Sequence, residues 1–149
     1  MTKSKQAVEF FRSGMNCAQS VLLAFADELK LNRQTALRIA AGFGGGMGKL
    51  QGTCGAVTGA YMVLGLYRGN AAGDNRKLME GSYDLVRQYS TQFSKEFGST
   101  SCMDLVRVDM KTPEGNERFK SENIKEEICC RVVERSVEIL ESLILPAKS

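Results

Sequence analysis

The sequence contains no histidine, and aromatic residues make up only 7% of its 149 residues. The absence of histidine excludes Cys-His dyads, Ser-His-Asp triads, histidine-ligated haem and zinc sites that mix cysteine with histidine. The net charge is +3 without a concentrated basic stripe, and the aromatic residues are too few for a base-stacking surface. Nucleic acid is therefore not the expected partner.

Long apolar runs are also absent. No segment approaches the apolar length needed to span a membrane, and residues 1–6 lead directly into an amphipathic segment without the apolar core of a secretory signal. We therefore expect a soluble, cytoplasmic protein with no membrane span. The length fits one domain, residues 1–149, with a core large enough to fold without disulfides.

Close cysteine pairs of the Cys-x-x-Cys type are missing as well. The chain has five cysteines, which are Cys17, Cys54, Cys102, Cys129 and Cys130. Structural zinc sites, thioredoxin-type sites and ferredoxin-type sites usually contain such close pairs. Any site that uses several of these cysteines must therefore be assembled by the fold.

Most of the chain has apolar residues at three- and four-residue steps, and no segment shows the strict alternation of a half-buried strand. We predict an all-α, single-domain bundle of about five to six helices. A short first helix is expected around residues 7–11, ended by Ser13-Gly14. The other main helices are expected near residues 17–29, 33–43, 54–67, 75–97 and 122–145, with a short helix after Ser101. Residues 111–123 are polar and are predicted to form a connection with about one helical turn.

Three cysteines share one predicted local setting. Asn16 and Thr53 are predicted N-caps, and residues 98–101 supply caps for another helix, so Cys17, Cys54 and Cys102 fall in first helical turns. Unpaired N–H groups and the helix dipole favour a thiolate there. We therefore predict that the pKa of Cys54 lies below the free-cysteine value of about 8.5. Burial among apolar neighbours would oppose this shift.

A glycine-rich segment precedes Cys54. Residues 41–48 contain five glycines, which predicts a tight backbone turn. The segment follows a helix and lacks the Gly-Lys-Ser/Thr ending of a phosphate-binding loop, so close helix packing is favoured over phosphate binding. Gly55 and Gly59 lie one helical turn apart and would let another helix approach closely.

The cysteine motifs resemble those of the C-GCAxxG-C-C family. The matching segments are Asn16-Cys17-Ala18-Gln19, Cys54-Gly55-Ala56-Val57-Thr58-Gly59, Gly98-Ser99-Thr100-Ser101-Cys102 and a cysteine that opens the last helix. The resemblance covers nearly the whole chain. This family is known by four cysteines and a Cys-Gly-Ala-x-x-Gly motif, and its members are often encoded near transporters. The resemblance implies a redox-active protein and selects Cys17, Cys54 and Cys102.

The fourth cysteine is either Cys129 or Cys130. We favour Cys129 because it lies four residues before the apolar Val133 and on the same helical face, although the three-residue spacing of Cys130 is nearly as good. Consecutive helical residues diverge by about 100°, so one member should face the site and the other should pack away from it. We expect the four selected cysteines to approach one another in space.

Two functions remain open at this point. In the first, Cys17, Cys54, Cys102 and Cys129 form a thiol-disulfide oxidoreductase site in which Cys54 attacks and a second cysteine resolves the mixed disulfide. Its partner would be a redox protein or a small thiol. In the alternative, the same four thiolates hold a zinc ion or an iron–sulfur cluster. A third interpretation, a non-catalytic adaptor associated with a transporter, depends only on the family's gene neighbourhood.

Overall fold

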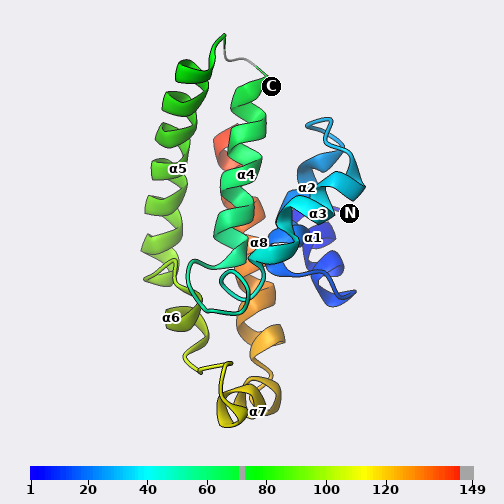
Figure 1. Cartoon of the computed structure of the whole chain (residues 1–149), viewed down its shortest axis with the longest axis vertical. Coiled ribbons are helices and arrows are strands. Elements are labelled where there is room, and N and C mark those ends of the chain that lie inside the picture. The colour runs from blue at the N-terminus through cyan, green and yellow to red at the C-terminus, as the bar shows by residue number, and fades with distance from the viewer. Residues whose placement is uncertain (71–72, 145–149) are drawn as a thin grey trace.

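The computed structural model describes residues 1–70 and 73–144 (Figure 1). This part of the chain forms eight α-helices and no strand: α1 (Lys3–Arg12), α2 (Cys17–Ala26), α3 (Arg33–Ala40), α4 (Gly55–Gly69), α5 (Asn75–Phe97), α6 (Cys102–Val106), α7 (Pro113–Ser121) and α8 (Cys130–Ile144). A 3₁₀-helix, η1 (Ala41–Phe43), follows α3, and a π-helix, η2 (Lys125–Cys129), precedes α8. The predicted all-α class is confirmed, but the number of helices is eight rather than five to six.

Local capping signals explain where several helices begin. Asn16 accepts a hydrogen bond from the N–H of Gln19 at 2.8 Å, and the Gln19 side chain accepts one from the N–H of Asn16 at 3.0 Å. This reciprocal capping box starts α2, as predicted. Asn32 and Ser101 cap α3 and α6 by a single bond each, in which the side-chain oxygen accepts from the N–H of Thr35 and of Asp104.

The segment 111–123, predicted as a connection, contains the nine-residue helix α7. Thr112 is its N-cap and accepts a hydrogen bond from the N–H of Gly115 at 3.0 Å, while Pro113 occupies the first helical position. The helix has few apolar residues, so periodicity did not reveal it. The predicted last helix begins instead as η2, and its predicted end at residue 145 lies outside the described residues.

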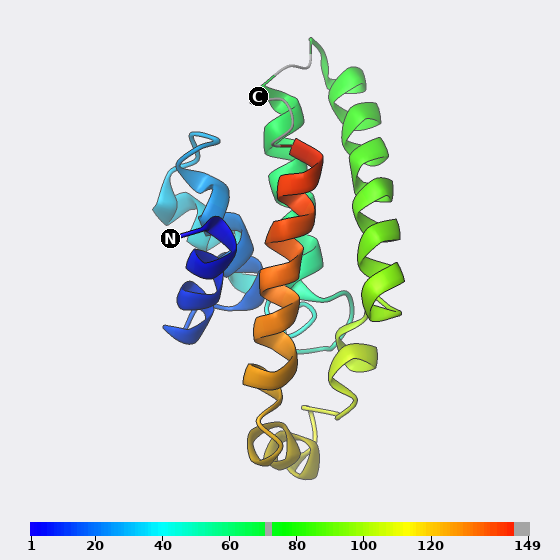
Figure 2. The ribbon, with the colours of Figure 1, turned by 180° about the vertical axis from the view of Figure 1, so that it is seen from behind.

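In Figure 1 helix α4 lies in front of α8, between α5 and the α1–α3 group, and from behind α8 runs between the α1–α3 group and α5 (Figure 2). The largest fully buried side chains come from α2, α4, α5 and α8: Tyr89, Phe25, Phe93, Leu22, Leu64, Ile139 and Leu140. Tyr83, in the first half of α5 (Asn75–Phe97), is 54% exposed. Only the second half of α5, with Tyr89 and Phe93, contributes fully buried residues.

At the lower end of α4 the chain forms the glycine-rich loop, and α6 and α7 lie further down (Figure 1). The site described next lies at this end of the bundle, where α2 and α4 begin. No helix in the described part of the chain combines the length and the apolar character that a membrane crossing requires.

Candidate functional site

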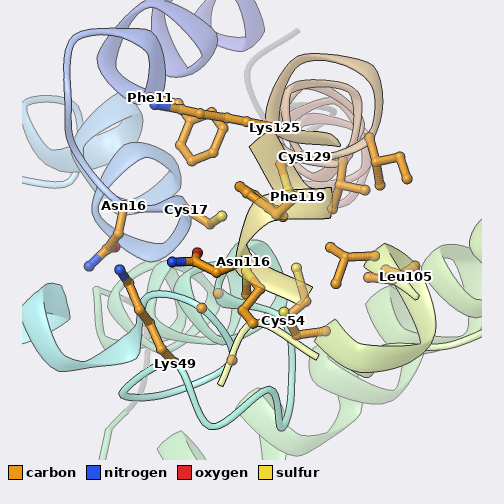
Figure 3. Close-up of a pocket in the computed structure, with 18 of the residues that line it drawn as sticks. Phe11, Asn16, Cys17, Lys49, Cys54, Leu105, Asn116, Phe119, Lys125 and Cys129 are labelled. Carbon is orange, nitrogen blue, oxygen red and sulfur yellow. The ribbon is translucent and has the colours of Figure 1, made fainter. Parts of the chain in front are cut away.

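A pocket of about 610 Å³ contains the predicted site residues. Cys17, Cys54, Cys102 and Cys129 all line it, whereas Cys130 is not among its lining residues. Figure 3 shows Cys17, Cys54 and Cys129 around this pocket, each coming from a different segment of the chain. The fold thus brings together four thiols that the sequence separates by as many as 112 positions, from 17 to 129.

Gly55 and Gly59 allow α4 to lie directly against the start of α2. A Cβ atom added at Gly55 would lie 3.0 Å from Cys17 Cβ and 3.0 Å from the Ala18 nitrogen. A Cβ atom added at Gly59 would lie 2.8 Å from the Ala18 carbonyl oxygen. The predicted close helix approach is therefore confirmed, and it places the first turns of the two helices side by side.

Cys54 and Cys102 are joined through their backbones. The Cys54 N–H donates to the Thr100 carbonyl at 2.8 Å, and the Cys102 N–H donates to the Gly52 carbonyl at 2.7 Å. These bonds flank a single antiparallel bridge between Thr53 and Ser101. Because successive residues of an extended segment point to opposite sides, Cys54 and Cys102 share one side of this bridge. A single bridged pair leaves no alternating pattern, so the sequence did not predict it.

The glycine-rich loop contains one turn of left-handed backbone. Residues 45–49 all have positive φ angles, from 59° at Lys49 to 74° at Gly46. The predicted tight turn is thereby confirmed. A Cβ atom at Gly46 would lie 2.6 Å from Gln51 Cα and 2.8 Å from Cys102 Cβ, so only glycine fits where the loop contacts Cys102.

Gln51 anchors this loop to the segment after α6. Its side chain is buried, with 4% exposure. The amide nitrogen donates to the Val108 carbonyl at 2.8 Å, and the amide oxygen accepts from the Met110 N–H at 2.7 Å. Sequence analysis did not single out Gln51, since its partners are 57 and 59 residues away and leave no local signal.

Cys129 and Cys130 diverge at the start of α8. Cys129 is half-buried and lines the pocket. Cys130 is buried on another side, where its Sγ lies 3.6 Å from Glu126 Oε2, and Glu126 in turn pairs with Arg12. The structure therefore places Cys129 with the other three pocket cysteines; its chemical role remains a prediction.

The prediction of a lowered pKa for Cys54 is wrong, because burial raises the pKa of this thiol to about 11. Cys54, rather than Thr53, is the N-cap of α4, and no cap hydrogen bond to its side chain forms. The N–H groups of Ala56 and Val57 favour the thiolate, but the cost of burying the charge is larger. Burial also raises the pKa of Cys129 to about 12 and the pKa of Cys17 well above its ordinary value.

Cys102 has the surroundings most favourable to a thiolate. Its pKa is raised by burial, but the Gln51 side chain and the positive charge of Lys111 both act in the opposite direction. A negative charge on Cys102 contributes to the raised pKa of Cys17, Cys54 and Cys129. Among the pocket thiols, Cys102 is therefore expected to ionise first.

Alkylation of the reduced protein tests this order. We expect iodoacetamide to label Cys102 faster than Cys54 at neutral pH. A pKa of about 11 in place of 9.0 lowers the Cys54 thiolate fraction about a hundredfold, so its labelling should rise steeply as the pH approaches 11. Peptide mass spectrometry across a pH series, with the denatured protein as the control, measures both rates. Equal labelling of the two cysteines at neutral pH would contradict the assignment.

The alternative prediction is a metal site formed by the same four thiols. Among the described residues, no group of three or more cysteine, aspartate or glutamate side chains is arranged to hold a metal ion. A closed shell of four thiolates around zinc or an iron–sulfur cluster stays an untested alternative prediction.

These features define a helical protein with a recessed pocket of four thiols. The model of the family described as "putative redox-active protein (C_GCAxxG_C_C)" matches residues 15–143, and the chain belongs to this family. An uncharacterized protein from Archaeoglobus fulgidus is 26% identical over 153 residues, which cover 97% of this chain and 95% of that protein. No solved structure matches the chain.

Proposed function

We propose that the pocket is a thiol-disulfide exchange centre, in which two cysteines reduce the disulfide of a substrate. The observation that carries this proposal is the convergence of four thiols, from four separate segments, on one cavity. The backbone bridge supports Cys54 and Cys102 as the reacting pair, since it holds both residues on one side of a short two-stranded unit.

In the proposed reaction, the Cys102 thiolate attacks one sulfur of the substrate disulfide. The substrate S–S bond breaks, a mixed disulfide forms, and the first substrate thiolate leaves and takes up a proton. Cys54 then loses its proton and attacks Cys102 Sγ, which releases the second substrate thiol and forms a Cys54–Cys102 disulfide. Two electrons pass from the two cysteines to the substrate.

The raised pKa values affect the rate of this reaction. A buried thiol that remains protonated at neutral pH reacts slowly with solutes, because the thiolate is the nucleophile. The reduced state is thereby protected until a substrate enters the pocket and contacts Cys102, whose thiolate is favoured by the charge of Lys111. Cys17 and Cys129 line the same cavity and supply two further thiols that can take over the disulfide by internal exchange.

Disulfide mapping tests the proposal. We expect one equivalent of a small disulfide, added anaerobically to the reduced protein, to consume two of the five thiols and to yield two small thiols. Peptide mass spectrometry should identify a Cys54–Cys102 linkage. Cys102→Ser should abolish the reaction at neutral pH, while Cys54→Ser should stop it at the mixed disulfide.

Cys130→Ser is the matched control, because Cys130 neighbours Cys129 but does not line the pocket. This variant should react like the unsubstituted protein. Oxidation that links two chains, or that requires Cys130, would contradict the proposed centre. Iron or zinc bound stoichiometrically in anaerobically purified protein, with all four pocket thiols protected from alkylation, would favour the metal alternative.

A further inference from the structure

The polar side chains that line the pocket carry charge of one sign only. They comprise three lysines and three asparagines, which are Lys49, Lys120, Lys125, Asn16, Asn116 and Asn123. None of the described residues that line the pocket is an aspartate or a glutamate. In the view of Figure 3, Lys49 and Lys125 lie on either side of Cys17.

The three lysines are not neutralised within the described part of the protein. None of them forms an ion pair there, whereas Lys3 and Lys111 pair with carboxylates elsewhere. Lys125 instead lies over the Phe11 ring, with its Nζ 4.9 Å from the ring centroid. Unpaired cations around a recess with low-dielectric walls attract anions and raise their local concentration.

The left-handed turn adds two backbone donors to the pocket lining. The N–H groups of Gly45 and Gly46 donate no hydrogen bond to any described residue, although Gly46 is buried. Buried N–H groups are nearly always paired, so an unpaired donor in a pocket wall suggests a ligand acceptor. Successive N–H groups in a turn can form an anion-binding concavity.

The pocket's size and the depth of its thiols restrict the ligand further. The pocket volume is about 610 Å³. Pockets that bind small molecules have volumes of roughly 300–1,000 Å³. Cys54 and Cys102 are each only 7% exposed, so a disulfide on the surface of a folded protein would not reach them. The partner is therefore expected to be a small molecule.

We infer that the pocket selects small organic disulfides that carry negative charge, such as dicarboxylate disulfides. This inference rests on the proposed function and identifies its substrate class. The lysines hold the anionic groups, and the S–S bond reaches Cys102. The electron balance is that of the exchange reaction above, and the products are two anionic thiols.

Three disulfides of similar size and different charge test the inference: 3,3′-dithiodipropionate, a dianion; bis(2-hydroxyethyl) disulfide, which is neutral; and cystamine, a dication. Each disulfide would be mixed with the reduced protein, and the rate of a single turnover would be measured. This rate would then be divided by the rate at which the same disulfide reacts with a small neutral thiol in solution, which corrects for its intrinsic reactivity. We expect the corrected rate to be at least about tenfold higher for the dianion than for the dication. This preference should fall to a few-fold in roughly 0.5 M salt.

Substitution of the pocket lysines shows whether the preference comes from the charges around the pocket or from the net charge of the whole protein. The triple variant Lys49→Gln, Lys120→Gln, Lys125→Gln should lose most of the preference for the dianion over the dication. A control with the same loss of charge replaces three exposed lysines outside the pocket: Lys5→Gln, Lys30→Gln, Lys77→Gln. We expect this control to keep the preference.

The outcomes distinguish the two proposals. If the protein reduces none of the three disulfides, the proposed exchange function fails. If it reduces all three with equal corrected rates, or if the distant-lysine control loses as much preference as the pocket variant, exchange stands and the inferred selectivity is wrong. A preference for the dication would also overturn it.

Discussion

Gly59→Ala is expected to lower the free energy of unfolding by about 1–3 kcal/mol, the cost of forcing an extra methyl group into a closely packed contact. The new Cβ atom would lie 2.8 Å from the Ala18 carbonyl oxygen and 3.1 Å from Ala18 Cα. Both are backbone atoms, so no side-chain rotation relieves the clash. Helices α2 and α4 would have to separate, and the separation would also move Cys17 away from Cys54.

Gly65→Ala is the matched control on the same helix. A Cβ atom at Gly65 would meet no atom within 4 Å. Alanine loses less backbone entropy than glycine in a helix interior, so this variant should be more stable by roughly 0.5–1 kcal/mol. Urea unfolding monitored by circular dichroism measures both changes. If Gly59→Ala were as stable as Gly65→Ala, the proposed close contact between α2 and α4 would be wrong.

Gln51→Met is expected to destabilise the protein by about 2–4 kcal/mol, because it leaves two buried backbone groups without partners. Methionine has a similar length but cannot accept from the Met110 N–H or donate to the Val108 carbonyl. The substitution also removes a side-chain interaction that favours the Cys102 thiolate. Iodoacetamide should therefore label Cys102 more slowly at neutral pH than in the unsubstituted protein.

Gln92→Met tests the same chemical change at an exposed position of α5. This variant should stay within about 0.5 kcal/mol of the unsubstituted protein. Cys102 labelling separates the two effects of Gln51, because a purely structural loosening of the loop would expose Cys102 and speed its reaction. Faster labelling of Cys102 in Gln51→Met would contradict the role given to the amide.

The sequence by itself was sufficient for the helical class and for most helix starts. The signals for these features are local, because a cap such as Asn16 and its partner Gln19 are three residues apart. Apolar periodicity predicted α5 over residues 75–97, and the structure has the same limits. The segment 113–121 was missed because its helix start depends on a Thr112 cap and Pro113, while its apolar stripe is too weak to detect.

The glycine pattern of the Cys-Gly-Ala-x-x-Gly motif predicted a close helix contact, but not the helix that makes it. Only the tertiary structure decided that this helix is α2 and that Cys17 thereby lies beside the start of α4. Likewise, helical spacing alone allowed either Cys129 or Cys130 at the site. The packing of α8 decided that Cys129 lines the pocket and that Cys130 lies against Glu126.

The sequence determined the chemical groups of the pocket, and the tertiary structure decided their chemical state. Helix-start positions predicted acidic thiols, since capping is a local interaction between neighbouring residues. Burial depends on every segment that packs around a side chain, and it raised the pKa of Cys54 to about 11. The relative ease of ionising Cys102 depends on Gln51 and Lys111, which the fold brings to it from the glycine-rich loop and from the segment after α6. Such non-local contacts leave no periodic pattern along the chain, and only the folded structure contains them.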